Sequence, residues 1–302
     1  MTISVVLTCY KQEKYIEQTI LSVINQSFKD RELLVWDDSP DDNCRNIISK
    51  YVEKYPDKIR ARHHNPNKWI VNNMQFLIEH RSKESEYIAF LEWDDCLFSE
   101  YLDEKIKVFD KNSNIKLVYN EVTTIDLEWK MIEEKQLKQY TVWFCKKWKI
   151  SYNELISNMY YMSWSTLMVR SDIIDKYTFI PNFLWPQTII SDIYCFNKIA
   201  HNEDIYGIDK PLVYYRIQKN SVSNNINGVI KYDYELIEYY KFLLKQWYIS
   251  DSTYKKRTHR LYLLICTASL KKCLNMWFFS TSKIFISESL HSIKMRVKWF
   301  HK

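Results

Sequence analysis

The chain has 302 residues, which is enough for one large domain or for a domain with an appendage. Hydrophobic residues make up 46% of it, a content that supports a folded core and excludes a disordered chain. Only two glycines are present, which excludes glycine-rich phosphate loops, so a bound phosphate group would need a metal ion, basic side chains or a helix N-terminus.

Short apolar runs alternate with amphipathic segments along the first 120 residues. Residues 3–8 predict a buried strand, and apolar side chains at helical spacing predict a helix over 14–27. The alternation continues with strands over 32–36, 59–62, 87–92 and 115–119 and with helices over 43–55, 72–80 and 99–110. This order predicts an α/β fold with a mostly parallel central sheet flanked by helices.

Two of the expected strands end in acidic pairs. Asp37 and Asp38 follow the second strand, and Asp94 and Asp95 follow the fourth. Because ligands of open α/β sheets bind at the carboxyl ends of the strands, we expect both pairs to line one crevice.

The second half of the chain is less regular. Residues of roughly 120–180 give no clear pattern, whereas 188–200 predict a helix and 211–216 a strand. From about residue 229 the pattern is helical to the end, after a loop signal over 224–228. We therefore expect one α/β domain over 1–228 and a helical C-terminal extension over 229–302.

The extension carries most of the positive charge. Residues 251–302 have 11 Lys and Arg against 2 Asp and Glu, a net of +9, which leaves −3 on the first 250 residues. Aromatic residues are interleaved with these basic ones, namely Trp277, Phe278, Phe279, Trp299 and Phe300. Such a pattern is typical of a helix on an anionic membrane surface, and equally of a packed terminal helix. Nucleic acid is the partner that it favours least.

Cysteine usage and the absence of targeting signals indicate the compartment. The seven cysteines are scattered, odd in number and never spaced C-x-x-C, which argues against a zinc site or a disulfide framework and favours a reducing compartment. We find neither a signal peptide nor a run of ~18 uncharged apolar residues. We therefore expect a cytoplasmic protein, with contact only at the inner face of a membrane.

Five motifs in order resemble the family 2 inverting glycosyltransferases, which have the GT-A fold, over roughly residues 2–225. They are an opening strand (3–10), a helix end (20–28), a nucleotide-binding strand (32–38), a metal-binding segment (87–97) and a closing block (209–223). The resemblance implies a Rossmann-like GT-A sheet and a sugar-nucleotide donor.

The resemblance also implies a nucleoside site. It implies that Thr8, Tyr10 and Asp38 line this site, with Tyr10 packing on the base, and that Asn72 or its neighbour Asn73 faces the nucleotide. A carboxylate such as Asp38 can accept hydrogen bonds from a base N–H and from ribose hydroxyls. Capping of the following helix is the alternative role for Asp38.

The acidic run over 92–95 is the expected metal segment. A hard cation, Mn²⁺ or Mg²⁺, bound by carboxylates can neutralise charge on a departing diphosphate. The resemblance favours Asp95 as the direct ligand, with Asp94 and Glu92 contacting ribose, water or metal. A solvated acidic turn is the alternative. Arg216 in the closing block can pair with the diphosphate or with a structural carboxylate.

Inverting transfer needs a general base that takes the proton of the acceptor hydroxyl. The resemblance favours Asp192, which begins the helical run after Ser191, and places the pair Glu203–Asp204 second. Two departures from the family pattern concern this chemistry: Ser191 replaces an acid, and Gln218 replaces a histidine.

The predicted function is transfer of a sugar from a nucleoside-diphosphate sugar, with a UDP-sugar favoured, to a hydroxyl of a glycan or a lipid-linked saccharide. A nucleotidyltransferase is the alternative enzyme, and its usual glycine-rich entry loop is absent. A binding module that kept the fold and lost catalysis is the alternative from another class.

Overall fold

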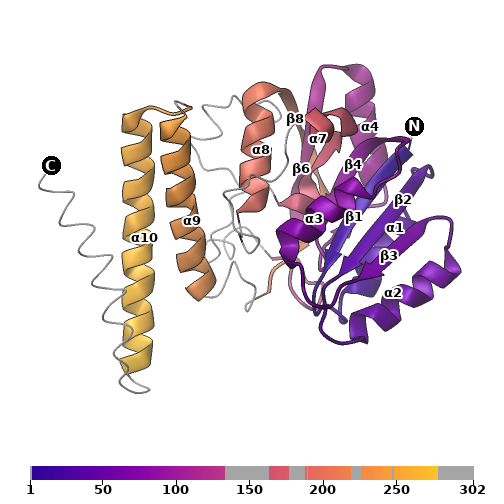
Figure 1. Ribbon diagram of the computed structural model, residues 1–302, viewed down its shortest axis with the longest axis horizontal. Coiled ribbons are helices and arrows are strands. Elements are labelled where there is room, and N and C mark those ends of the chain that lie inside the picture. Colours follow the sequence, from indigo (N-terminus) through magenta and orange to yellow (C-terminus); the bar gives the residue numbers. More distant parts are fainter. Residues whose placement is uncertain are drawn as a thin grey trace, which may run out of the picture. The chain divides into compact units, whose positions relative to one another are not determined.

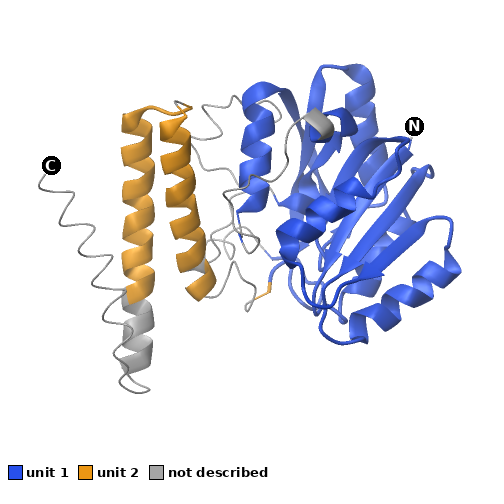
Figure 2. Ribbon diagram, in the orientation of Figure 1, with its two compact units in different colours: residues 1–217 blue, residues 218–302 orange. Residues whose placement is uncertain are grey.

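The computed structural model describes residues 2–132, 163–176, 188, 190–218, 226–246 and 248–277. The chain divides into two compact units, Met1–Ile217 and Gln218–Lys302 (Figure 2). The domain boundary that we predicted after residue 228 falls inside helix α9 (Ile226–Lys245). The division of the chain therefore comes before that helix.

The first unit is built on one mixed sheet (Figure 1). Its strands follow the order β3-β2-β1-β4-β7-β6-β8-β5. They are β1 (Thr2–Cys9), β2 (Arg31–Asp37), β3 (Ile59–His63), β4 (Ser85–Leu91), β5 (Cys96–Leu97), β6 (Ile115–Ile125), β7 (Met168–Arg170) and β8 (Asp204–Arg216). Four of the seven pairings among the described strands are parallel, as the predicted βα alternation requires.

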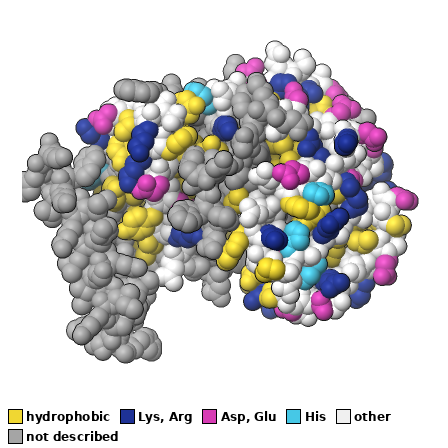
Figure 3. All heavy atoms as spheres, in the orientation of Figure 1, with side chains coloured by type: hydrophobic (Ala, Val, Ile, Leu, Met, Phe, Trp, Pro, Cys, Tyr) yellow, Lys and Arg dark blue, Asp and Glu magenta, His cyan; other side chains and the backbone are white. Residues whose placement is uncertain are grey.

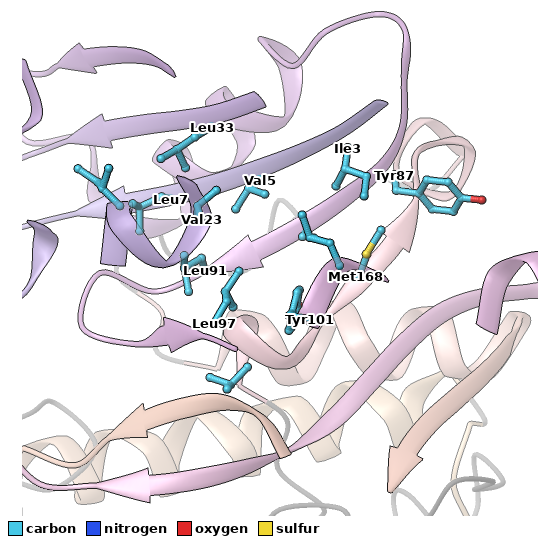
Figure 4. Close-up of a cluster of buried hydrophobic side chains, with 14 of the residues drawn as sticks. Ile3, Val5, Leu7, Val23, Leu33, Tyr87, Leu91, Leu97, Tyr101 and Met168 are labelled. Atoms are coloured by element: carbon cyan, nitrogen blue, oxygen red, sulfur yellow. The ribbon is translucent and has the colours of Figure 1, made fainter. Parts of the chain in front are cut away.

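Helices cover both faces of this sheet. The described helices are α1 (Ile16–Ile24), α2 (Asn43–Lys54), α3 (Trp69–Glu79), α4 (Tyr101–Lys111), α7 (Ser171–Lys176) and α8 (Ser191–Asn202). Alternate side chains of β1, β2 and β4 pack with α1, α2 and α4 in one buried cluster, part of which Figure 4 shows. The side chains between them point to the opposite face of the sheet, which α3 covers. There Trp36 of β2 packs against Phe76 of α3.

The predicted elements of the first 120 residues are confirmed, with ends that shift by up to three residues except at β6, which runs on to Ile125. Four of the described elements were not predicted, including the short helix α7. The strands β5 and β7 are only two and three residues long, and the 3₁₀ turn η1 (Trp164–Thr166) lies in the region without a clear pattern. Strand β8 begins at Asp204, seven residues before its expected start. The prediction missed residues 204–210 because they alternate less clearly between apolar and polar.

The second unit contains helices α9 and α10 (Asp251–Trp277), which confirms its helical character over the described residues. The two helices pack through apolar side chains, among them Leu236, Ile237, Leu261 and Ile265, all at most 2% exposed. None of the helices in the described part of the chain has the length and apolar character needed to cross a membrane. Of the predicted tail aromatics, Phe278, Phe279, Trp299 and Phe300 lie outside the described residues.

Candidate functional site

The carboxyl ends of β1, β2 and β4 lie at one edge of the sheet. In the parallel register Cys9 pairs with Asp37, and Leu7 pairs with Leu91. The acids that follow β2 and the acidic run that follows β4 are therefore brought to the same edge, as the sequence predicted. This edge also carries Thr8 of β1, paired with Trp36.

Two serines around η1 hold the acidic run. The hydroxyl of Ser163 donates to Glu92 Oε2 (2.9 Å), and the hydroxyl of Ser165 donates to Asp95 Oδ2 (2.6 Å). Ser165 Oγ in turn accepts the main-chain N–H of Glu92 (3.0 Å). The run is thus fixed by a segment about seventy residues further along the chain.

Asp95 is almost completely buried, with 1% of its surface exposed, and both of its oxygens accept protein hydrogen bonds. Besides Ser165, the main-chain N–H of Arg216 donates to Asp95 Oδ1 (2.9 Å). Asp94 is only half-buried. The carboxylate of Asp95 thus joins the end of β8 to the acidic run, whereas that of Asp94 has access to solvent.

Arg216 is engaged by oxygen atoms of the protein. Its guanidinium donates to the main-chain carbonyls of Asp94 (2.9 Å) and Asp126 (3.2 Å) and to Gln18 Oε1 (3.1 Å). It also lies within 5 Å of the ring centroids of Tyr15 and Trp129. The side chain is 3% exposed, so this geometry gives Arg216 a role in holding the acidic run rather than a direct contact with a diphosphate.

Negative charge accumulates around the run. Burial, followed by the charges of Asp94 and Asp192, raises the pKa of Glu92 to about 8. Burial and the same kind of repulsion, from Asp94 and Glu92, raise the pKa of Asp95. A site that crowds carboxylates in this way favours a bound cation.

Asp192 lies in the first turn of α8 and is 4% exposed. Its carboxylate accepts the main-chain N–H of Ile193 (2.8 Å). Its charge contributes to the raised pKa of Glu92, after burial and the charge of Asp94.

The second candidate base lies elsewhere. Glu203 caps the end of α8, and Asp204 begins β8, twelve residues before the end that Asp95 holds. The pair therefore lies at the opposite end of β8 from the acidic run.

On the nucleoside side, Asp38 is 3% exposed and reaches across to α3. Its Oδ2 accepts the main-chain N–H groups of Lys68 and Trp69, both at 2.9 Å. Asp38 therefore caps α3, not the helix that directly follows it. Its Oδ1 lies 3.5 Å from His64 Nδ1, whereas the buried hydroxyl of Thr8 has no hydrogen-bond partner among the described residues.

His64 orients this end of the site. The indole N–H of Trp36 donates to His64 Nε2 (2.9 Å), and an indole nitrogen can only donate. The ring proton of neutral His64 is therefore on Nδ1, which faces Asn73 Oδ1 (3.1 Å) and Asp38 Oδ1 (3.5 Å). Figure 3 shows histidine and basic side chains together on the first unit.

The remaining predicted nucleotide residues differ in exposure. Tyr10 is 39% exposed, and Lys11 Nζ lies over its ring at 5.5 Å from the centroid; the main-chain N–H of Lys11 is held by Ser39 Oγ (2.8 Å). Asn72 is exposed on α3, whereas Asn73 is buried and bonded to His64. Of the two asparagines, Asn73 is the one that the fold ties to Asp38.

The sequence did not identify Ser163, Ser165, His64 or Tyr215 as site residues. The pKa of the Tyr215 phenol is raised by burial and by all four acids, Glu92, Asp95, Asp94 and Asp192. For Tyr215, the signal in the sequence was its position in the closing block, one residue before Arg216.

The chain is similar to curated glycosyltransferases. The chain is 24% identical over 265 residues to the Escherichia coli UDP-Glc:alpha-D-GlcNAc-diphosphoundecaprenol beta-1,3-glucosyltransferase WfgD, covering 87% of this chain and 90% of that protein. The matches to two further curated glycosyltransferases span only 41% and 40% of those proteins.

Solved structures share the fold. S. aureus TarS 1–349 in complex with UDP-GlcNAc superposes with a TM-score of 0.59 at 14% identity, covering 97% of this chain and 79% of that one. The mannosyltransferase PcManGT from Pyrobaculum calidifontis, in complex with GDP-Man and Mn²⁺, gives 0.60 at 10% identity, covering 96% and 84%. The family model described as glycosyl transferase family 2 matches residues 4–177, more than half of the chain. With its GT-A fold, the chain belongs to glycosyl transferase family 2.

Proposed function

We propose that the chain is an inverting, metal-dependent glycosyltransferase that moves a sugar from a nucleoside-diphosphate sugar to a hydroxyl of a glycan or a lipid-linked saccharide. The observation that carries this proposal is the acidic run at the carboxyl edge of the sheet, fixed by Ser163 and Ser165, in a chain of glycosyl transferase family 2. With Asp192 as its base, this site would supply both carboxylates for a cation and a base for the acceptor. The hydrogen bond from Arg216 N–H to Asp95 fixes the strand that brings Tyr215 there.

The carboxylates of the acidic run fit a hard divalent cation as its ligands. Carboxylate oxygens are the ligands that Mn²⁺ and Mg²⁺ prefer, and the mutual repulsion that raises the pKa of Glu92 would be relieved by a cation. When bound, such an ion neutralises the charge that develops on a departing diphosphate. PcManGT was solved with Mn²⁺, which supports the same choice here.

Within the run we assign the metal contact to Asp94, with Glu92 beside it. An ion that meets a diphosphate needs a partly exposed ligand, and Asp94 is half-buried, whereas Asp95 is only 1% exposed. This assignment moves the direct ligand from Asp95, which the sequence favoured, to its neighbour. Asp95 and Arg216 then act as positioning residues.

The nucleoside contacts fall to Thr8 and Asp38. The buried hydroxyl of Thr8, which has no hydrogen-bond partner among the described residues, can donate to a ligand or accept from it at the sheet edge. Asp38 can accept through Oδ1, beside His64, and the exposed Tyr10 ring can stack on a base. Of the nucleotides, we favour uridine, because WfgD is named for UDP-Glc and TarS binds UDP-GlcNAc. The name of WfgD also supports a lipid-diphosphate acceptor.

Asp192 is the general base of this proposal. Its carboxylate takes the proton of the acceptor hydroxyl while the acceptor oxygen bonds to the anomeric carbon and the bond from that carbon to the diphosphate oxygen breaks. Attack opposite the leaving group inverts the anomeric centre. Burial of Asp192 keeps bulk water from competing for this position.

The second unit suits contact with an anionic membrane surface, where lipid-linked acceptors reside. Lys256, Arg260, Leu263 and Leu264 are exposed on α10 at spacings of three and four residues, which places them on one face. Figure 3 shows basic side chains beside hydrophobic ones on this unit. Such contact would hold the protein peripherally on the cytoplasmic face.

The test is a thermal-shift screen of nucleoside diphosphates and sugar nucleotides with and without Mn²⁺, followed by hydrolysis of the donor that binds best. A transferase stabilised by UDP and Mn²⁺ should slowly hydrolyse the UDP-sugar. Release of pyrophosphate from a nucleoside triphosphate would instead identify a nucleotidyltransferase. Binding without turnover on any acceptor would identify a non-catalytic module.

A further inference from the structure

Two cysteines and an aspartate meet beneath the sheet edge, apart from the acidic run. Cys9 ends β1, Asp37 ends β2 and Cys44 is the second residue of α2. Their Sγ and carboxylate oxygen atoms all lie within 4.8 Å of one another, and all three residues are at most 1% exposed. The sequence argued against a zinc site because no C-x-x-C spacing occurs, but here the strand register and the start of α2 bring distant residues together.

The donor set is that of a soft or borderline cation. Two thiolates and one carboxylate are typical zinc ligands, with Zn–S near 2.3 Å and Zn–O near 2.0–2.2 Å. A tetrahedral site built on those lengths separates its ligand atoms by about 3.5–4 Å. The present spacing therefore needs movements of only about 1 Å to close on an ion.

The groups around the three residues are those that orient metal ligands. His63 Nδ1 lies 2.9 Å from Asp37 Oδ2 and donates to it, while Ser39 N–H donates to Asp37 Oδ1 (2.9 Å). The main-chain N–H of Gln12 donates to Cys44 Sγ (3.2 Å). Hydrogen bonds of this kind hold a carboxylate and a thiolate ready for a metal.

The Cys44 thiol also differs from the other buried cysteines. Cys44 has its pKa lowered to about 7, chiefly by its hydrogen bond to Cys9, so that one thiolate forms near neutral pH. Cys96, in contrast, has its pKa raised to about 12 by burial.

We propose that Cys9, Asp37 and Cys44 form a binding site for Zn²⁺ that joins the ends of β1 and β2 to the start of α2. The site is distinct from the Mn²⁺ or Mg²⁺ site proposed at the acidic run, because its ligands are soft thiolates and come from other elements. It lies next to Thr8 and Asp38 in sequence, so zinc would fix the backbone that carries the proposed nucleoside contacts. Binding releases thiol protons, as thiolate sites require.

The test uses the full chain, reduced and freed of metal, titrated with Co²⁺ as a spectroscopic probe and then with Zn²⁺. A thiolate-to-cobalt charge-transfer band should grow to one equivalent per chain and be displaced by Zn²⁺. Cys9→Ser and Cys44→Ser should each abolish the band, and His63→Asn should weaken zinc binding about 10–100-fold. Cys266→Ser, on α10, is the matched control and should leave the band unchanged.

The Asp94→Asn variant separates this site from the proposed function. It should keep the cobalt band whether or not it loses Mn²⁺-dependent nucleotide binding, because thiolate bands do not report carboxylate sites. The proposal is overturned if the wild-type chain gives no band, or if the band survives Cys44→Ser. A disulfide between Cys9 and Cys44 would also overturn the proposal. It would appear in the mass spectrum as a chain about two mass units lighter than the fully reduced protein, even after preparation under reducing conditions.

Discussion

Asp94 and Asp95 are adjacent, yet the structure gives them different tasks, and substitution can separate those tasks. We expect Asp94→Asn to abolish Mn²⁺-dependent binding of UDP and to leave folding nearly unchanged. Asp95→Asn should retain that binding, while Asp95→Ala should destabilise the first unit. The reasoning rests on the two hydrogen bonds that Asp95 accepts and on the solvent access of Asp94.

The magnitudes follow from those bonds. Asp95→Ala leaves the buried Arg216 N–H and the Ser165 hydroxyl without their acceptor, at about 1–3 kcal/mol each, or about 2–6 kcal/mol together. For a unit of this size each kcal/mol lowers Tm by about 2–4 °C, so we expect a fall on the order of 10 °C. In Asp95→Asn the amide oxygen still accepts from Arg216 and one repelling charge is lost, so the loss should stay below about 1 kcal/mol.

The assay pairs thermal unfolding with titration of UDP in Mn²⁺ or in chelator, for the wild type and the three variants. Ser165→Ala is the matched control, because it removes one of the two bonds of Asp95 without touching a carboxylate. The reasoning is refuted if Asp95→Asn loses Mn²⁺-dependent binding at unchanged Tm while Asp94→Asn keeps it. Asp95 would then be the metal ligand.

Three further outcomes are expected. Asp192→Asn should leave donor binding intact and reduce transfer by at least about 100-fold, which is the usual worth of a general base, and full activity measured with an acceptor would contradict the assignment. Metal-free protein should lose stability as pH rises from about 4.5 to about 8, because Glu92 has an ordinary pKa of 4.5 and a pKa of about 8 when folded; Tm against pH should flatten in Glu92→Gln. Lys105, which is fully buried, donates to the carbonyls of Val118 (3.0 Å) and Thr166 (2.6 Å), so Lys105→Met should lower denaturant stability by about 2–5 kcal/mol and loosen η1; an unchanged midpoint would show that the two carbonyls find other donors.

Much of the first unit followed from local pattern. Apolar runs such as 3–8 and 87–92 can only be buried strands between helices, and the helical spacing of residues 16–24 gives α1 its buried face. Because parallel strands align their carboxyl ends, the register alone brought the acids of β2 and β4 to one edge. The sequence thus determined the sheet, its functional edge and the acidic residues there.

What the sequence left open was the partner of each acid. Ser163 and Ser165 reach Glu92 and Asp95 from a turn about seventy residues away, and Arg216 reaches Asp95 from 121 residues away. Hydrogen bonds at such separations leave no periodicity in the chain, so only the tertiary structure decided that Asp95 is held and Asp94 is accessible. The same reason applies to Cys9 and Cys44, whose spacing resembles no metal motif and whose proximity arises from the pairing of β1 with β2 and the position of α2.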